Sequence, residues 1–422
     1  MYEYYSPTKI LFGDGCLSEA APRLKDMGAT RALLVTGTSS TATSEGFRKL
    51  CADLDVAGIR WTHFAEVRAD PETSTVDRGA ARYLAEGCDS IIGFGGGSPI
   101  DCAKGIAASV AEGRSIRDFV GTGLAFTASV PPLVAIPTTA GTGTEVTNAA
   151  VFTVVDESGH RSKKGTSSQF YFPCLALVDP LLHASMPPAL TAATGMDALT
   201  HAIEAYVSRF HTPISDMCCL ESIRLIGRSL RTACRPNASG SEPTVEASAA
   251  SAASGDACAA RRDMALAATL AGVALSQAGL GMVHGFAHPV GATTGLAHGL
   301  ANAILLPFVM EALIPDAGER LSDIGVALTS GALTSSTPTE GALANTSRIS
   351  PAEAVRAIAR LGHDIGIPVN LSAASVPEGA FEAILADALS YRRRKASPRA
   401  FTDAELRELL SKMYHGEICT SA

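Results

Sequence analysis

The segment CDSIIGFGGGSPIDCAKGIAASV, residues 88–110, constrains the fold of this chain more than any other. Its residues 90–94 form a short apolar run, which is typical of a parallel strand covered on both faces. Three glycines follow, then Ser98 and Pro99 at the expected helix start, and a helical pattern from Asp101. A strand, a glycine turn and a helix N-terminus form an anion site, because glycine lets backbone amides approach a phosphate that the helix dipole favours. A tight strand–helix turn without a ligand contains the same glycines, so both interpretations remain open.

Two further segments begin with a strand pattern: RALLVTGTSS at 31–40 and LVAIPTTAGTGTEVTNAAVFTVV at 133–155. In the second, Pro137 ends the strand, and hydroxyl groups follow at short intervals. Hydroxyls and free amides suit a sugar–phosphate chain or a nicotinamide amide. With helical segments such as 77–87 between them, these strands predict a Rossmann-like, doubly wound parallel α/β domain over 1–186. Nucleotides bind at the carboxyl ends of such strands.

The second half of the chain reads as helical. From about residue 187 the apolar residues recur with a helical period, which predicts an all-α domain over 187–422. Residues 236–260 are rich in Ser and Ala and contain few large apolar residues, so we expect an inserted mobile loop without a core of its own. A second such stretch, 329–347, is expected to form a surface loop.

Potential metal ligands occur in two helical segments. Asp197 and His201 are four residues apart, as are His284 and His288, and His298 follows in the same glycine-rich stretch. Residues i and i+4 share a helix face, so each segment can direct two side chains to one point. Imidazoles and a carboxylate together suit a divalent first-row metal ion such as iron or zinc. Hydrogen-bonded core histidines are the alternative that spacing alone leaves open.

Composition limits the classes of function. The 422 residues carry a net charge of −8, which argues against an electrostatic nucleic-acid binder. The N-terminus does not resemble a signal peptide, and no run of 18 or more apolar residues predicts a membrane span. Ten scattered cysteines without a CxxC pair indicate reduced thiols. We therefore expect a cytoplasmic protein that binds neither nucleic acid nor membrane.

Three signatures occur in order: GGGSPIDCAK, IPTTAGTGTEVT, and the pair TGMDALTHAIEAY and GMVHGFAHPVGATTGLAHG. Together they resemble the iron-containing (group III) alcohol dehydrogenases over nearly the whole chain, from Tyr5 to Tyr414. The resemblance implies a dehydroquinate synthase-like two-domain fold, with a nucleotide domain at 1–186 and a helical metal-binding domain at 187–422. It also implies a homodimer or a higher homo-oligomer.

The resemblance implies a role for particular residues. Fe²⁺, or Zn²⁺ in its place, is held by Asp197, His201, His284 and His298. His288 lies near the substrate without binding the metal, and we expect it to relay a proton. Asp101 either orients the loop or the nicotinamide, or is a carboxylate stabilised by the helix dipole. The other implied coenzyme contacts lie in the glycine turn and the threonine loop, and one lysine reaches the ribose. These residues are Gly96, Gly97, Ser98, Thr138, Thr139, Thr142, Thr147 and Lys163. Lys164 is the alternative to Lys163.

One departure from the family pattern concerns the coenzyme. Many members end the strand at 31–37 with an acidic residue that binds the adenosine ribose and repels a 2′-phosphate. Gly37 stands there in this chain, followed by Thr38, Ser39 and Ser40, whose hydroxyls can bind a phosphate. NAD is the expected coenzyme, and NADP is possible because the repelling carboxylate is absent. The sequence places no Arg or Lys beside this turn.

We therefore expect an NAD(P)-dependent enzyme that interconverts a small primary alcohol and its aldehyde by hydride transfer in a cleft between the domains. A metal ion supplies Lewis acidity there, and Phe286 and Asn148 are possible substrate contacts. One alternative is a metal- and NAD-dependent lyase of the dehydroquinate synthase type. That enzyme needs basic residues around a phosphate, whereas Ala, Gly, Leu and Val flank the histidines. A non-catalytic nucleotide sensor or scaffold is the other alternative.

Overall fold

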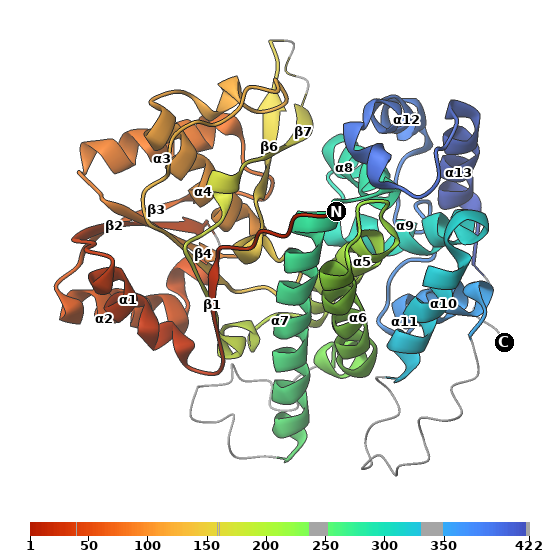
Figure 1. Ribbon diagram of the computed structural model, residues 1–422, viewed down its shortest axis with the longest axis horizontal. Helices are drawn as coiled ribbons and strands as arrows, with labels where there is room; N and C mark the ends of the chain where they lie inside the picture. Colours follow the sequence, from red (N-terminus) through yellow and green to blue (C-terminus); the bar gives the residue numbers. More distant parts are fainter. Residues whose placement is uncertain (39, 158, 160, 236–251, 331–348, 419–422) are drawn as a thin grey trace. The chain divides into compact units, whose positions relative to one another are not determined.

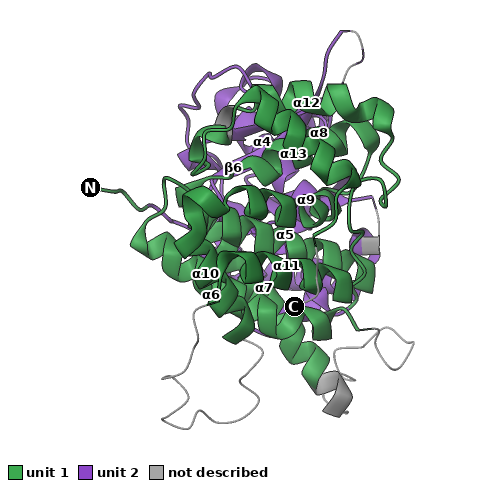
Figure 2. Cartoon of the chain, turned by 90° about the vertical axis from the view of Figure 1, so that its right-hand side faces the viewer, with its two compact units in different colours: residues 1–4, 185–422 green, residues 5–184 purple. Residues whose placement is uncertain are grey.

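The computed structural model describes residues 1–422 except 39, 158, 160, 236–251, 331–348 and 419–422. It consists of two compact units, coloured separately in Figure 2. One unit comprises residues 5–184, and the other comprises residues 1–4 and 185–422. The change of unit thus falls two residues before the expected domain boundary, and the first four residues group with the C-terminal unit.

The unit of residues 5–184 contains a six-stranded parallel sheet with the strand order β1-β8-β5-β4-β2-β3. Figure 1 shows α1 and α2 on one face of this sheet and α3 and α4 on the other. The sequence prediction of a doubly wound parallel domain is therefore confirmed. The bounds are β1 (Lys9–Phe12), α1 (Ala20–Asp26), β2 (Arg31–Gly37), α2 (Glu45–Ala57), β3 (Arg60–Val67), α3 (Thr73–Ala85), β4 (Ser90–Gly95), α4 (Gly97–Glu112), β5 (Leu133–Pro137) and β8 (Leu175–Val178).

Successive side chains of the central strands point alternately to the two faces of the sheet and fill the core on each side. Leu33 and Ile91 point to the core beneath α3 and α4, where they meet Ile106. Leu34 and Ile92 point to the opposite core with residues of α1 and α2. Successive side chains of a strand face opposite sides, so a strand covered on both sides must be apolar throughout. This explains the continuous apolar runs in β2 and β4.

An antiparallel hairpin lies outside the main sheet and was not predicted as a separate element. Its strands are β6 (Ala149–Val155) and β7 (Arg161–Ser167), with Thr153 paired to Lys163. In the sequence, the first of these strands continues the segment that contains the threonine loop, 133–155, without a separate signal. The hairpin contacts α4 through β6, and it brings Lys163 to Asp70, which follows β3.

The second unit is helical in its described residues, as predicted. Three of its helices begin with capping boxes, in which Thr212, Ser350 and Thr402 accept from the third helical amide. Proline in the first turn further favours a helix start at α6 and α11. The bounds are α5 (Pro188–Val207), α6 (Pro213–Ala233), α7 (Ala252–Ala278), α8 (Met282–Thr294), α9 (His298–Ala312), α10 (Ile314–Ser330), α11 (Pro351–Asp364), α12 (Phe381–Ser390) and α13 (Asp403–His415).

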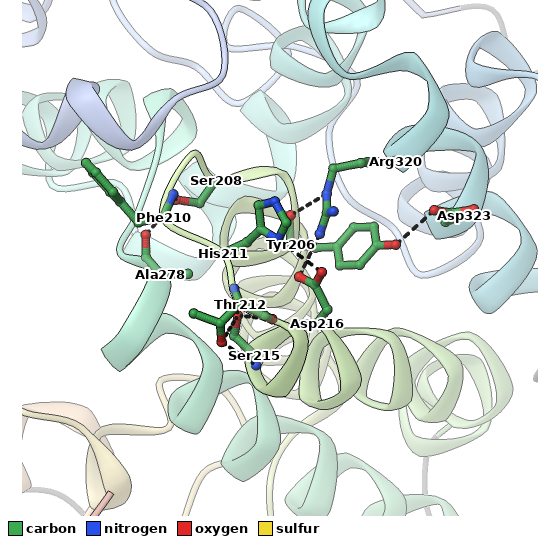
Figure 3. A network of polar contacts seen from close by, with 10 residues as sticks. All are labelled: Tyr206, Ser208, Phe210, His211, Thr212, Ser215, Asp216, Ala278, Arg320 and Asp323. Atoms are coloured by element: carbon green, nitrogen blue, oxygen red, sulfur yellow. Dashed lines mark hydrogen bonds and ion pairs between the residues drawn. The ribbon is translucent and has the colours of Figure 1, made fainter. Parts of the chain in front are cut away.

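A polar network joins three of these helices (Figure 3). Arg320 of α10 donates to the carbonyl oxygen of Tyr206 at 2.7 Å and to Asp216 of α6 at 2.6 Å. Its guanidinium also lies 3.9 Å from the centre of the Tyr206 ring, and the Tyr206 hydroxyl donates to Asp323. One side chain thus connects the end of α5, the start of α6 and α10.

The expectation for residues 236–260 is partly wrong. Residues 236–251 lie outside the described residues, but residues 252–260 are helical and form the start of α7. Alanine has the highest helix propensity, so an Ala-rich stretch with few large apolar residues can still extend a helix. The second proposed loop, 329–347, begins at the end of α10 and otherwise lies outside the described residues.

No single helix among the described residues combines the length and hydropathy of a membrane span. Two sharply bent helix pairs reach those limits by length and composition alone.

Candidate metal centre and coenzyme-binding loops

Helix α5 supplies the first two potential ligands. Asp197 and His201 lie one turn apart on its buried face and are 2% and 5% exposed. The Nε2 atom of His201 lies 3.8 Å from Oδ1 of Asp197. Burying a carboxylate and an imidazole costs free energy unless hydrogen bonds, charges or a metal compensate.

Helices α8 and α9 bring two further histidines to the same point. His284, in the first turn of α8, places its Nε2 atom 3.1 Å from Nε2 of His201. His298 begins α9, and its Nε2 atom lies 3.8 Å from Oδ1 of Asp197. Ligand atoms of Asp197, His201 and His284 all lie within 4.8 Å of one another. The structure thus brings together the four residues that the resemblance gives as ligands, and their binding of a metal stays a prediction.

Asn302 lies at the centre of this group and was missed by the sequence analysis. Its Nδ2 atom is 2.6 Å from Asp197 Oδ1, 3.1 Å from His284 Nε2 and 3.2 Å from His298 Nε2. Potential ligand atoms from three helices therefore converge on one position. The only signal in the sequence was that Asn302 lies one helical turn after His298.

Glu204 was also missed, although it shares a face of α5 with Asp197 and His201. It is fully buried, and burial raises the pKa of its carboxyl group to about 7. Its Oε2 atom lies 2.6 Å from Nδ1 of His284, and Oε1 accepts from the Val283 amide at 2.6 Å. The carboxylate therefore caps the start of α8 and orients the His284 ring. When Nδ1 donates to Glu204, the lone pair of Nε2 faces the other ligand atoms.

These side chains fit a divalent first-row metal ion. Three imidazoles and one carboxylate are a common ligand set for iron or zinc. A carboxylate that accepts from the far nitrogen of a ligating histidine is typical of such sites, since it fixes the tautomer and the orientation of the ring. Glu204 would have this role towards His284 in a metal-loaded site, since its Oε2 atom lies 2.6 Å from Nδ1 of His284. The residues do not distinguish Fe²⁺ from Zn²⁺.

His288 lies beside the cluster, one turn after His284. Its ring centre is 5.7 Å from that of His284, 5.2 Å from that of His298 and 6.0 Å from that of Tyr391. It is half-buried, as a residue that exchanges a proton with a substrate would be. Phe286, which the sequence suggested as a substrate contact, is completely buried in the helical core.

In the other unit, the glycine turn joins β4 to α4. Two of its positions leave little room for a side chain: a Cβ on Gly97 would lie only 2.7 Å from Thr142 Cγ2, and one on Gly96 would lie in tight contact, 3.2 Å from Thr139 Oγ1. The threonine loop therefore packs directly on the backbone at the start of α4, as the sequence suggested. The Ser98 hydroxyl accepts from the amide of Asp70 at 3.2 Å. Thr138 follows β5 at the same edge, and its amide donates to the Gly95 carbonyl.

A buried lysine supports this loop and was not singled out in the sequence. Lys104 is completely buried, and its ammonium donates to Thr144 Oγ1, Thr147 Oγ1 and the carbonyls of Thr147 and Ala149, all within 2.9 Å. Burial lowers the pKa of this lysine to about 8. The Thr147 hydroxyl, expected to contact the coenzyme, is 3% exposed and bonded to Lys104.

Asp101 lies beside Lys104 on α4. Its carboxylate accepts from the Thr144 hydroxyl at 2.5 Å and from the Val151 amide at 2.9 Å. Burial raises its pKa, and the charge of Lys104 opposes this shift. These contacts join α4 to the threonine loop and β6. They favour the loop-orienting role among the alternatives that the sequence left open.

Lys163 extends from β7 towards the same region. Its side chain is 4% exposed, and Nζ lies 2.7 Å from Oδ1 of Asp70. Asp70 has a left-handed backbone with a φ of 56°, which is uncommon for a residue other than glycine. The neighbouring Lys164 is exposed. Contact between Lys163 and a coenzyme ribose stays a prediction. The structure adds that Asp70 is the ion-pair partner of this lysine.

A doubly wound unit with a glycine turn and a helical unit with a buried imidazole–carboxylate cluster are the parts expected of a metal-dependent oxidoreductase that uses a nicotinamide coenzyme.

Comparison with known proteins identifies the family. The model of the iron-containing alcohol dehydrogenases matches residues 7–180, and that of the C-terminal region of the Fe-containing alcohol dehydrogenase family matches residues 191–414. The chain belongs to this family.

Two relatives and one solved structure match over nearly the whole chain. The chain is 36% identical to a 1,3-propanediol dehydrogenase of Citrobacter freundii, over 98% of this chain and 99% of the relative. It is 33% identical to an NAD-dependent methanol dehydrogenase of Bacillus methanolicus, over 97% and 99%. A solved structure of 1,3-propanediol oxidoreductase superposes with a TM-score of 0.85 at 34% identity, covering 98% of this chain and all of that one.

Proposed function

We propose that this protein interconverts a small primary alcohol and its aldehyde, with a nicotinamide coenzyme as the hydride acceptor or donor. The observation that carries the proposal is the convergence of potential ligand atoms from α5, α8 and α9. Membership of the iron-containing alcohol dehydrogenases and the names of its relatives support it. The substrate is proposed to be short, as in those names.

Asp197, His201, His284 and His298 would hold the metal ion, with Fe²⁺ as the first candidate and Zn²⁺ as the second. A divalent ion in this ligand set supplies Lewis acidity towards the substrate oxygen. Three neutral imidazoles and one carboxylate leave a net positive charge on such a site, and Glu204 keeps the His284 ring in the tautomer that can ligate.

His288 is the proposed proton carrier. In the oxidation direction the carbinol carbon loses a hydride to the coenzyme, and the hydroxyl proton passes to His288 and then to solvent. Its half-buried ring beside His284 and His298 suits this role. Gly96, Gly97 and Ser98 are proposed to bind the pyrophosphate, and the threonine loop with Lys163 is proposed to contact the rest of the coenzyme.

The finer points of location and assembly are proposals as well. We propose a cytoplasmic protein, as the cysteine usage indicated, that forms a homodimer or a higher homo-oligomer, as the resemblance implied. The nine cysteines in the described residues are all free thiols, which is compatible with a reducing compartment. Light scattering coupled to gel filtration measures the number of subunits directly.

The lyase alternative is not favoured by the comparisons, because the matching family models and relatives are dehydrogenases. A non-catalytic protein would have no need to keep three buried ligand residues together with an orienting carboxylate.

The test is oxidation of NADH and NADPH by anaerobically purified protein with two- to four-carbon aldehydes, after chelation and after return of Fe²⁺ or Zn²⁺. Turnover that disappears on chelation and returns with metal is the expected result. His284→Ala should abolish both metal binding and turnover, whereas the exposed His363→Ala should change neither. Retention of both by His284→Ala would refute the ligand assignment.

A further inference from the structure

The carboxyl end of β2 lies between two other strand ends. In the sheet, β2 is flanked by β4 and by β3. Val35 pairs with Gly93 of β4, so both strands reach the same edge two residues later, at Gly37 and Gly95. A dinucleotide whose pyrophosphate lies at the glycine turn after β4 extends its adenosine ribose to the end of the neighbouring strand. The 2′ position of that ribose therefore belongs at the end of β2.

The structure places an arginine beside the end of β2, which corrects the expectation that no basic residue stands near the turn. Gly37 pairs with Val67, and the Thr38 amide donates to the Val67 carbonyl at 3.2 Å. Thr38 and Arg68 are thus the next residues of two adjacent parallel strands, whose backbones lie about 4.8 Å apart. They are separated by 30 positions in the sequence, so only the pairing of β2 with β3 reveals that they are neighbours.

The charges around Arg68 favour an anion. Arg68 and Thr38 are both exposed, and no ion pair involves Arg68 in the described part of the chain. The two acidic residues nearest to it in sequence have other partners: Glu66 binds Arg78 at 2.9 Å and Asp70 binds Lys163 at 2.7 Å. The carboxylate that would repel a phosphate is absent at Gly37. A ribose hydroxyl needs no cation, whereas a phosphate dianion binds a guanidinium strongly.

We propose that Thr38 and Arg68 form a binding site for the adenosine 2′-phosphate, and that NADP(H) is the preferred coenzyme. This rests on the proposed function only in that a nicotinamide dinucleotide binds to the unit of residues 5–184. Of the hydroxyl groups suggested from the sequence, that of Ser39 lies outside the described residues. The positive charge that the turn after β2 lacks is supplied by Arg68.

The experiment measures the dissociation constants of NADPH and NADH by coenzyme fluorescence, without substrate, for the full-length protein. The wild type should bind NADPH more tightly than NADH. Arg68→Ala should raise the dissociation constant of NADPH about tenfold and leave that of NADH within about twofold of the wild-type value. The reason is that a charged hydrogen bond is lost from one coenzyme only. Gly37→Asp should also weaken NADPH selectively, because a carboxylate would face the phosphate. Higher salt should reduce the NADPH preference of the wild type.

Arg60→Ala is the matched control, since Arg60 is exposed at the opposite end of β3 and should affect neither coenzyme. An unchanged NADPH constant in Arg68→Ala, or equal losses for both coenzymes, would overturn the 2′-phosphate site and leave the oxidoreductase proposal standing. Selective loss of NADPH in a protein that turns over no aldehyde would support the site while refuting the proposed reaction.

Discussion

At the scale of single residues, the candidate metal centre depends on side chains that bind no metal themselves. Glu204 fixes the His284 ring through Nδ1 and holds the Val283 amide at the start of α8. One carboxylate thereby connects helix geometry to ligand geometry. Its two contacts can be separated, because a glutamine keeps one oxygen to accept from the Val283 amide and places an NH₂ group where the other oxygen faces His284 Nδ1.

Glu204→Gln should lower metal affinity about 10- to 100-fold, as loss of a partner of a ligating histidine does elsewhere. The amide oxygen can still accept from Val283, but the amide NH₂ would donate to Nδ1 and move the His284 proton to Nε2. Competition with a chromophoric chelator measures the affinity. The thermal stability of the metal-free variant should stay near that of the wild type, and wild-type affinity would contradict the orienting role.

In the α/β unit, Lys104 supports the threonine loop much as Glu204 supports the metal-site histidine. Its buried ammonium group contacts four oxygen atoms of that loop and β6. Lys104→Met should leave these acceptors and the nearby Asp101 carboxylate uncompensated. The loss of unfolding free energy should be at least about 2 kcal/mol, because buried unsatisfied groups cost about 1–3 kcal/mol each. Urea denaturation measures it, and coenzyme affinity should fall as the threonine loop loosens.

Lys49→Met provides the comparison for this variant, since Lys49 is half-exposed in a surface ion pair with Asp53. Exposed pairs of this kind contribute about 0–1 kcal/mol. Equal effects of the two substitutions would show that the buried lysine has no special role.

At the scale of elements, the helical unit is held by side chains that join helix ends. Arg320 connects α10 to the last turn of α5 and to the first turn of α6 (Figure 3). The α5 helix also carries Asp197, His201 and Glu204, so the position of its C-terminal end bears on the metal centre.

Arg320→Met should lower the unfolding free energy of the protein by about 1–3 kcal/mol, because it removes hydrogen bonds to the Tyr206 carbonyl and to Asp216. Methionine retains much of the apolar stem, so the loss reports on the polar contacts. Chemical denaturation followed by circular dichroism measures the change. Unaltered stability would mean that the network is dispensable. Arg360→Met, at an exposed position of α11, serves as the control.

At the scale of the whole molecule, the metal should stabilise the helical unit. A ligand that binds only the native state at about 1,000 times its dissociation constant adds about 4 kcal/mol. Chelation should therefore move the helical unfolding transition at 222 nm to a lower temperature. Trp61, the single tryptophan, lies in β3 of the other unit, so its fluorescence follows that unit separately. An unchanged 222 nm transition after complete metal removal would contradict a native metal site.

Local patterns determined much of this protein from the sequence alone. Apolar runs before glycine turns predicted β2 and β4, and the run that Pro137 ends predicted β5. The helical period from residue 187 predicted the second unit. Spacing by one turn placed Asp197 with His201, and family resemblance added His284 and His298. These inferences succeed because strand burial, glycine turns and helix faces depend on residues that are close in the chain.

Contacts between distant residues were decided only by the tertiary structure. Glu204 meets His284 across 80 positions, and Lys104 meets Thr147 across 43. The neighbours Thr38 and Arg68 likewise depend on the pairing of β2 with β3. A polar residue on a helix or at a strand end has the same local pattern whether it faces solvent or a buried partner. Its partner is therefore fixed by how the elements pack, which no local pattern in this sequence records.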